Sequence, residues 1–361
     1  MPRLPRRHCT DRGCARAGAG GVNQHDMRTI KRTSGDVGNA PGEEAGRALS
    51  ITAIILTFNE EIHIARCIER IRPLVERTVV VDCFSTDATA RIARALGAEV
   101  LQHPFKNYAT QFQWALDTCH PETAWVLRLD ADEYLEQGLC AELRRTLPTQ
   151  PSDVTGLEFR LQVIFQGRAI RHGRYYSTKL LRLWRTGAGK IEQRWMDEHT
   201  VLSHGRTAPL TGGDLVDHNL NDITFWINKH NGYATRHMID FVNREYGLFE
   251  EDERIRATGS AAARRRFLKN AVYAPTPLYL RAFLFYLYRY VFRCGFLDGR
   301  AGLVFHFMHA FWLHMLIDAK IDESRRYIRE HGLEGFKAHL KSRHNIELAP
   351  PVVDRGHADA A

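Results

Sequence analysis

The 361-residue sequence lacks the glycine patterns that hold dinucleotides and nucleoside triphosphates. Residues 57–61 read T-F-N-E-E after the first apolar run, where a dinucleotide fold needs G-x-G-x-x-G so that the backbone can approach a pyrophosphate. No P-loop pattern occurs either. Hydride transfer from a nicotinamide cofactor and P-loop phosphate chemistry are therefore disfavoured.

Cysteine is scarce, and its spacing carries no signature. The seven cysteines are an odd number, and no pair has the two-residue spacing of a zinc or redox site. We expect reduced thiols in a cytosolic compartment. Outside the N-terminal tail no compact Lys/Arg stripe alternates with aromatic residues, so nucleic acid is not expected as a partner. The net charge of +8 instead suits an anionic membrane surface or a phosphorylated substrate.

Residues 1–49 lack a periodic apolar pattern and also lack the apolar core of a secretory signal. They are rich in Gly, Ala and Arg, a composition typical of disorder. We predict a disordered basic tail, within which Met27 is an alternative start.

From residue 50 onward, short apolar runs alternate with helical periodicity. Such alternation with short connections predicts a parallel sheet covered on both faces. The later runs 157–165 and 179–184 predict a mixed or antiparallel extension, and 223–249 predicts a helix. In the first part we expect strands at 51–57, 78–82, 98–101 and 124–129, and helices at 62–71, 85–96 and 109–119.

Polar side chains follow three of these predicted strands. Because ligands bind at the carboxyl ends of the strands in such sheets, we expect these side chains to line one crevice. They are Asn59 and Glu60, Asp82 and Ser85, and Asp130 and Asp132.

The pair Asp130 and Asp132 stands just past a buried strand. Carboxylates at i and i+2 can share one hard cation, Mg²⁺ or Mn²⁺, which completes its shell with phosphate oxygens and water. Such a metal neutralises charge on a leaving nucleoside diphosphate. The alternative for this pair is a polar loop that caps the next helix.

Residues 51–135 carry the motifs I-I-L-T-F-N-E-E, V-V-V-D-C-F-S-T-D-A-T and W-V-L-R-L-D-A-D-E, in this order. With these motifs the chain resembles the family 2 glycosyltransferases of the GT-A fold, and more loosely so to about residue 215. The nearest resemblance is to transferases that build bacterial lipopolysaccharide core or exopolysaccharide. It implies an inverting, metal-dependent displacement from a nucleoside diphosphate sugar.

The resemblance also implies roles for residues that match the motifs. Asp82 is expected to hold the base or ribose with Ser85 beside it, although Ser85 and Asn59 can equally cap helices. The expected nucleotide-sugar contacts are Thr57, Asn59, Glu60, Asp82, Ser85 and Asp130, and the expected metal ligands are Asp132 and Asp130. One departure is the segment 111–113 (Q-F-Q), where the family often has an Arg-Asn pair. Contacts from that helix are therefore in doubt, and Lys106 and Arg128 are alternative sources of positive charge.

An inverting transfer needs a general base to deprotonate the acceptor hydroxyl. By its match to a His-Glu pair of relatives, Glu198 is the first candidate for this catalytic role, and Asp197 is the second. His199 is expected to complete the metal shell. The alternative for all three is a solvated polar turn.

Two further polar clusters accompany these candidates. Arg171, His172, Arg174 and Lys179 form a basic group that either holds phosphate oxygens or is simply solvated. The cluster of Asp214, Asp217 and His218 receives no predicted role.

Residues 278–297 are strongly apolar but include Arg281, Arg289 and Arg293, which fall on one side of a helix. Residues 301–317 contain no Lys, Arg, Asp or Glu, and are barely long enough to span a bilayer. We predict an interfacial or re-entrant hairpin with its arginines toward lipid headgroups, in preference to a spanning pair. The remaining alternative is a buried helical pair that covers the sheet or forms a dimer.

Together these observations predict an α/β GT-A fold with a helical C-terminal extension. The expected function is metal-dependent sugar transfer to a lipopolysaccharide, lipid-linked or exopolysaccharide acceptor, on the inner face of the bacterial inner membrane. The alternatives are a non-catalytic scaffold of a polysaccharide-synthesis complex and an enzyme with a soluble acceptor. The predicted segments are the tail 1–49, a GT-A domain 50–220, a helical region 221–275, the hairpin 276–330 and a C-terminal tail 331–361.

Overall fold

The computed structural model describes residues 47–196, 198–249 and 275–348. The predicted tail 1–49 lies almost wholly outside the described residues, and so does Asp197. Everything reported below belongs to one compact unit, residues 45–361.

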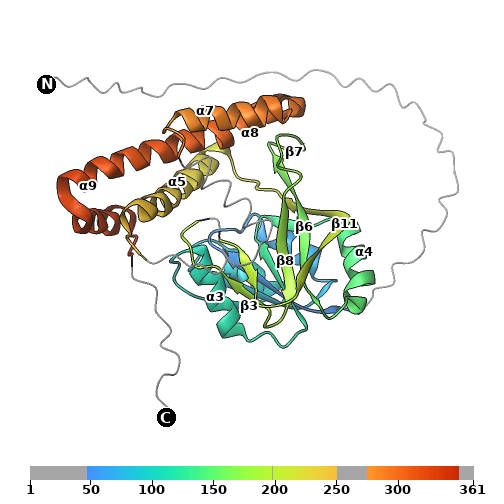
Figure 1. Cartoon of the computed structure of the whole chain (residues 1–361). Coiled ribbons are helices and arrows are strands. Elements are labelled where there is room, and N and C mark those ends of the chain that lie inside the picture. Colours follow the sequence, from blue (N-terminus) through green and yellow to red (C-terminus); the bar gives the residue numbers. More distant parts are fainter. Residues whose placement is uncertain (1–46, 197, 250–274, 349–361) are drawn as a thin grey trace, which may run out of the picture. The chain divides into compact units, whose positions relative to one another are not determined.

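Nine strands of the described residues form one mixed sheet, in the order β3-β2-β1-β4-β8-β6-β11-β5, with β7 paired to β6 (Figure 1). A separate two-stranded sheet joins β9 and β10. The strands are β1 (Leu49–Thr57), β2 (Val75–Asp82), β3 (Glu99–Gln102), β4 (Trp125–Asp130), β5 (Glu133–Leu135), β6 (Val154–Phe165), β7 (Arg168–Ile170), β8 (Lys179–Arg185), β9 (Gly189–Ile191), β10 (Thr200–Leu202) and β11 (Arg206–Asp217).

The strands β3, β2, β1 and β4 pair in parallel, as the alternation of strands and helices predicts. The antiparallel pairings of β8 with β4 and β6 form the predicted mixed extension. The helices beside these strands are α1 (Ile64–Ile71), α2 (Thr89–Ala95), α3 (Tyr108–Cys119) and α4 (Gln137–Thr146), and a short 3₁₀ turn, η1 (Leu147–Thr149), follows α4.

Strand β1 is buried on both faces, because its side chains alternate between two helical layers. Ile51 and Ile55 belong to the core that includes α1 and α4. Ile54 and Leu56 belong to the core built with α3. Beyond the carboxyl end of this buried strand, the loop carries the polar residues Asn59 and Glu60. The candidate site lies at this edge of the sheet.

The C-terminal part is helical. Its elements are α5 (Ile223–Tyr246), α7 (Leu280–Leu287), the π-helical turn η3 (Tyr288–Phe292), the 3₁₀ turn η4 (Gly295–Asp298), α8 (Gly299–His306), the π-helical turn η5 (Phe307–Trp312) and α9 (Leu313–His344). Helices α5 and α9 share an apolar core that includes Met238, Val242, Ile321 and Phe336. The hairpin of β6 and β7 packs on α8 through Phe165 and other apolar side chains.

Three sequence expectations about these elements are wrong. Helix α2 begins at Thr89, after the predicted cap at Ser85. The predicted C-terminal tail is helical as far as His344, because α9 continues through a kink at Gly332, which has φ +71°. The third concerns the arginines of the hairpin.

Two arginines predicted to face lipid headgroups face protein. Arg281 is buried and donates to Asp318 of α9 from Nε at 2.8 Å. Arg289 lies with its guanidinium 3.7 Å from the ring centroid of Tyr175 and donates to the Gly173 carbonyl oxygen. Arg293 alone is exposed. Within the described residues, no helix has both the length and the apolar character that crossing a membrane requires.

Candidate functional site

The parallel register of the sheet brings the predicted strand-end residues to one edge. Thr57 of β1 lies opposite Asp82 of β2, and Leu56 lies opposite Asp130 of β4. Because parallel strands end at the same edge, three acidic side chains from distant parts of the sequence, Asp82, Asp130 and Asp132, lie at one edge of the sheet. The predicted convergence therefore occurs.

Asp82 is buried and held by four donors. Thr57 Oγ1 donates to Oδ1 at 3.1 Å, and the Ser85 backbone N–H donates to Oδ2 at 2.9 Å. The Ser85 hydroxyl and the Gln102 side-chain amide also donate to this carboxylate. Ser85 thus fixes Asp82, which explains why it does not cap α2. The carboxylate is thus fixed in orientation, with donors on both of its oxygens.

The loop after β1 is locked to the loop after β2. The Asn59 backbone N–H donates to Ser85 Oγ at 2.8 Å, and Asn59 Oδ1 accepts from the Thr86 N–H at 2.8 Å. Asn59 has φ +54°, a left-handed conformation that Asn tolerates better than most residues. The alternative that Asn59 caps a helix is wrong, because its side chain bridges two loops.

Glu60 is linked through His63 to the chain after β11. Glu60 Oε2 lies 2.5 Å from His63 Nδ1, and His63 Nε2 accepts from the Leu220 backbone N–H at 2.8 Å. The Leu220 donor assigns the ring proton to Nδ1, so His63 donates to Glu60. Glu60 therefore supports the architecture of the crevice through a buried ring.

Asp130 lies beside a buried ion pair. Arg182 of β8 contacts Glu133 Oε1 at 2.5 Å and Asp130 Oδ2 at 3.3 Å. Burial raises the pKa of Glu133 well above its usual value, a shift that Arg182 opposes and Asp130 reinforces. Asp130 keeps a third of its side chain exposed, so it faces the crevice with part of its charge already neutralised.

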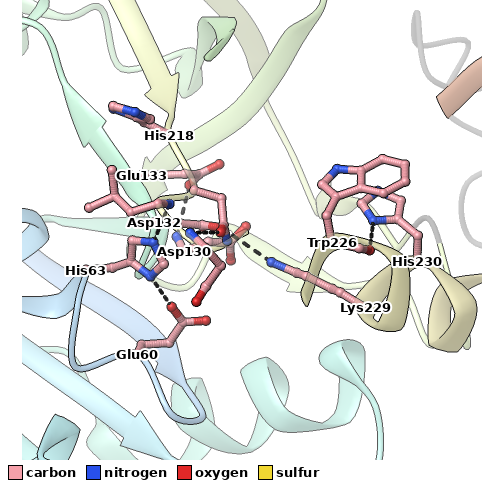
Figure 2. Close-up of polar contacts among 12 residues, drawn as sticks. Glu60, His63, Asp130, Asp132, Glu133, His218, Trp226, Lys229 and His230 are labelled. Carbon is pink, nitrogen blue, oxygen red and sulfur yellow. Dashed lines mark hydrogen bonds and ion pairs between the residues drawn. The ribbon is translucent and has the colours of Figure 1, made fainter. Parts of the chain in front are cut away.

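Asp132 is almost fully buried and receives two donors on one oxygen (Figure 2). The Asn219 amide donates to Asp132 Oδ2 at 2.9 Å, and Lys229 Nζ of α5 lies 3.4 Å from the same atom. Burial raises the pKa of Asp132, but the attraction of Lys229, the Asn219 hydrogen bond and His63 outweigh it and lower the pKa overall. Asp132 is therefore ionised at neutral pH.

A cavity of about 680 Å³ opens beside Asp132. Asp217 lines it, at the end of β11, and so do Lys229 and Tyr233. Burial, together with the charge of Asp132, raises the pKa of Asp217 to about 7, although Lys229 opposes the shift. Asp217 belongs to the cluster for which the sequence predicted no role.

Glu198 lies near the crevice but is held by an arginine. Arg128 of β4 contacts Glu198 Oε1 at 2.6 Å, and both side chains are about nine-tenths buried. The other candidate base, Asp197, is outside the described residues. This buried ion pair favours Glu198 as a support for Arg128.

The expectation that His199 completes a metal shell finds no support. Its Nδ1 lies 3.6 Å from Glu192 Oε2. In the described parts of the chain, no group of three or more His, Cys, Asp or Glu side chains could hold a metal.

The remaining donors still fit a hard cation. Asp130 and Asp132 are two carboxylates on one short segment. Arg182 contacts Oδ2 of Asp130, and Asn219 and Lys229 contact Oδ2 of Asp132. Mg²⁺ and Mn²⁺ are commonly bound through one or two carboxylates, with phosphate oxygens and water completing the shell. The residues present therefore fit such a cation without a third protein ligand.

The predicted basic group does not face the crevice. His172 Nδ1 lies 2.6 Å from Asp298 Oδ1 of η4, and the Arg171 backbone N–H donates to the same carboxylate. Arg174 donates to the Tyr288 hydroxyl. These contacts join the β6–β7 region to the C-terminal helices, and a phosphate role for the basic group stays a prediction. In the segment 111–113, which differs from the family pattern, Gln111 is buried and contacts His103.

The sequence analysis missed the contribution of α5. Trp226, Lys229, His230 and Tyr233 recur at i, i+3, i+4 and i+7, which places them on one helix face. All four line the cavity. A helix face usually carries aliphatic residues toward the core. The aromatic and basic residues on this face of α5 are the sequence signal that could have identified it.

The model of the family described as Glycosyl transferase family 2 matches residues 52–209. This segment is a family 2 glycosyltransferase domain. It includes Asp82, Asp130 and Asp132, whereas Asp217 and Lys229 lie beyond it. Together with the parallel strands β3-β2-β1-β4 and their mixed extension, the match confirms the predicted GT-A α/β fold.

Two curated relatives carry the comparison further. An uncharacterized glycosyltransferase of Rickettsia typhi is 34% identical over 136 residues, which are 37% of this chain and 46% of the relative. The lipopolysaccharide core biosynthesis glycosyltransferase LpsC of Rhizobium meliloti is 26% identical over 270 residues, 73% of this chain and 91% of the relative. The chain thus spans less than half the length of the first relative and most of the second.

Two solved structures are similar to about a third of this chain. Mannosyl-3-phosphoglycerate synthase from Rubrobacter xylanophilus is 21% identical, with 32% of this chain and 41% of that chain covered and a TM-score of 0.27. Glucosyl-3-phosphoglycerate synthase from Mycobacterium tuberculosis, in complex with Mn²⁺, uridine diphosphate and glucosyl-3-phosphoglycerate, is 24% identical, with 33% and 45% covered and a TM-score of 0.26.

Proposed function

We propose that this chain transfers a sugar from a nucleoside diphosphate sugar to a hydroxyl of a glycan or lipid-linked glycan, with inversion at the transferred carbon. The observation that carries the proposal is the convergence of Asp82, Asp130 and Asp132 at one edge of a family 2 glycosyltransferase domain. A family 2 domain that keeps these carboxylates in a preformed crevice favours a catalyst over a non-catalytic scaffold.

Each side of the crevice has a distinct task in this proposal. Asp82, oriented by Thr57 and Ser85, receives the base or ribose of the donor. Asp130 and Asp132 hold Mg²⁺ or Mn²⁺, which when bound neutralises charge on the leaving diphosphate. Asn59 and Glu60 border the nucleotide by fixing the loop after β1.

The attacking hydroxyl needs a proton acceptor on the side of the crevice away from the nucleotide. Asp217 lines the cavity beside Asp132, whereas Glu198 is paired with Arg128. We therefore assign the general base to Asp217 and keep Glu198, the candidate from the sequence, as the competing assignment. Asp197 remains a candidate from the sequence alone.

Isothermal calorimetry tests the donor site. The full chain is titrated with UDP, GDP, dTDP and CDP, with and without Mn²⁺, and compared with Asp132→Ala and Asp153→Ala. Asp153 is a matched control, because it is an exposed aspartate whose side chain pairs with Arg206. We expect metal-dependent binding of one nucleotide, lost in Asp132→Ala and kept in Asp153→Ala. Folded protein that binds none of the four nucleotides contradicts the proposal and favours the scaffold.

The acceptor and location follow from a second feature. The turn between α7 and α8 exposes Phe292 and Leu297 at 74% and 60% of their side chains, next to the exposed Arg293 and Arg300. Apolar and basic side chains together suit the surface of an anionic membrane. We therefore propose a peripheral position on the inner face of a bacterial inner membrane and a lipopolysaccharide or lipid-linked acceptor, with exopolysaccharide and soluble acceptors as alternatives.

A further inference from the structure

The cavity beside Asp132 has two chemically different ends. At one end lie Asp132, Asp217 and Lys229, the groups next to the proposed transfer site. The other end is lined by rings from the β6–β7 region, α5 and the C-terminal helices: Phe165, Tyr175, Trp226, His230, Phe305 and His309. Apolar walls with a few convergent polar groups are typical of small-molecule sites, and so is a volume of about 680 Å³.

Trp226 is the ring that connects the two ends. It stands one turn before Lys229 on α5, and Figure 2 shows the Lys229 side chain extending toward Asp132 while the Trp226 ring lies beside His230. His230 stacks on its indole with a centroid distance of 3.5 Å and an interplanar angle of 18°, and Phe165 meets it edge-on at 6.3 Å. These neighbours fix the indole, yet part of it remains exposed and lines the cavity.

The charge of the lining argues against an anionic ligand. Three aspartates line the cavity, Asp132, Asp217 and Asp222, against Lys229 as the one Lys or Arg among the lining residues that the structure describes. Lys229 is already bound to Asp132. The proposed divalent cation, held by Asp130 and Asp132, serves the diphosphate of the donor. A phosphate or carboxylate on the acceptor therefore meets Asp217 and Asp222 without a cation of its own, which costs binding energy.

The histidines of the aromatic end do not change this balance. Burial lowers the pKa of His230 to about 4, and burial also lowers the pKa of His309 well below its usual value. Both rings are therefore neutral at physiological pH and act as aromatic walls. A saturated sugar ring suits such walls, because its C–H groups pack against the electron-rich face of an aromatic ring while its hydroxyls reach polar groups at the rim.

We infer that this cavity is the acceptor subsite, and that it takes a neutral pyranose ring, one without phosphate or carboxylate, stacked on Trp226 with a hydroxyl directed to Asp217. The inference rests on the proposed function and names the acceptor class for that same site. Selection for a neutral sugar comes from the three aspartates, and orientation comes from the indole.

Saturation-transfer NMR on the full chain tests the subsite directly. The probes are methyl α-D-glucopyranoside, methyl α-D-mannopyranoside and glucose 6-phosphate at millimolar concentration. UDP and Mg²⁺ are present throughout, and Mn²⁺ is left out because it is paramagnetic and broadens the signals. We expect saturation of ring C–H protons of at least one neutral pyranoside and a weaker signal from the phosphate. Trp226→Ala reduces the neutral signal about fivefold, and Trp226→Phe retains most of it.

Phe292→Ala is the control, because this ring is exposed outside the cavity. A signal confined to the glycosidic methyl group, an equal or stronger signal from glucose 6-phosphate, or no signal from any pyranoside overturns the inference in wild-type protein, whether or not the Trp226 variants fold. Nucleotide titration of the same sample separates the two ideas. Nucleotide binding without pyranoside binding contradicts the acceptor subsite alone, whereas loss of both contradicts the proposed function as well.

Discussion

At the scale of single residues, acidic side chains in the crevice differ because their partners differ. Glu198 is held by Arg128, while Asp132 receives Lys229 and Asn219. Asp217 lines the cavity with a pKa of about 7, raised first by burial and then by the charge of Asp132. Carboxylates with similar chemistry therefore have different partners, and Asp217 combines a place in the cavity with a raised pKa.

This difference predicts which carboxylate acts as the base. We expect Asp217→Asn to lower kcat by about 100-fold or more, because a general base contributes 10²–10⁴ to the rate. Glu198→Gln should lower kcat by only about tenfold, because its loss weakens the positioning of Arg128 without removing the base. The measurement is kcat for sugar transfer, with nucleotide affinity from calorimetry as the check on folding. The reverse order of the two variants reassigns the base to Glu198.

Much of the donor side could be predicted from residues alone. Asp82, Asp130 and Asp132 follow apolar runs, and the rule that parallel strands end at one edge places them together. Lys229 and Asn219 could not be predicted in the same way, because they reach Asp132 through the fold over 97 and 87 positions of sequence. The predicted cap role of Ser85 was wrong for a related reason, because the Ser85 hydroxyl donates to Asp82 and does not cap α2.

At the scale of elements, the β6–β7 region and the C-terminal helices meet through glycines and a histidine. A Cβ on Gly173 would lie 2.1 Å from Cε1 of His306, and a Cβ on Gly295 would lie 2.5 Å from Cδ2 of the same ring. His306 is fully buried in α8. Two glycines thus make the space that one aromatic ring fills. No periodicity in the sequence indicates this contact.

We predict that Gly173→Ala is strongly destabilising. Gly173 has φ +67°, so an alanine there suffers both backbone strain and the clash with His306, together about 2–4 kcal/mol. Gly187→Ala is the matched control, because Gly187 has φ +81° but nothing within 4 Å of the added Cβ, and should cost about 1 kcal/mol. Chemical denaturation followed by circular dichroism measures both. Equal losses in the two variants would show that the ring yields to the methyl group.

The buried histidines of this region also predict acid sensitivity. Burial lowers the pKa of His230 and of His306 to about 4, whereas histidine in an unfolded chain titrates near 6.5. Between these values the unfolded chain binds more protons, so stability is complete above about pH 6.5 and falls as the pH drops toward 4. Each histidine should contribute on the order of 1–2 kcal/mol to this loss at about pH 5.

Thermal unfolding at about pH 7.5 and about pH 5 measures the effect, and His306→Gln should show a smaller decrease in Tm between the two values than the wild type. His339→Gln is a suitable control, because His339 is not fully buried and has no part in this contact. A decrease as large in His306→Gln as in the wild type would assign the acid sensitivity to other groups.

At the scale of the whole molecule, the described chain combines a family 2 domain with a helical part that was only partly predictable. The apolar composition of residues 278–317 indicated helices, but the direction of the arginines was wrong for two of three. Asp318 binds Arg281 from within the predicted hairpin 276–330, and Tyr175 packs on Arg289 from outside it. The apolar pattern of the segment indicates neither contact. Charges in an apolar segment do not reveal whether they face water, lipid or protein.

We predict that the exposed turn between α7 and α8 binds anionic membranes. Full-length protein should sediment with vesicles of phosphatidylglycerol and phosphatidylcholine, and less with phosphatidylcholine alone. The double variant Phe292→Ser/Leu297→Ser should lower the partition coefficient about tenfold or more, since each buried apolar side chain contributes roughly 1.5 kcal/mol or more. Ile62→Ser is the control, because Ile62 is 48% exposed but belongs to the loop before α1. Unchanged sedimentation of the double variant contradicts this surface.

The two sides of the site come from different parts of the chain, because α5 reaches Asp132 from beyond the family 2 domain. Groups on the donor side come from residues before 135, within the segment that the family shares, while Asp217, Trp226 and Lys229 come from beyond it. Under the proposed function, substitutions before residue 135 therefore change how the donor is held, whereas substitutions of Asp217 and Trp226 change which acceptor is received.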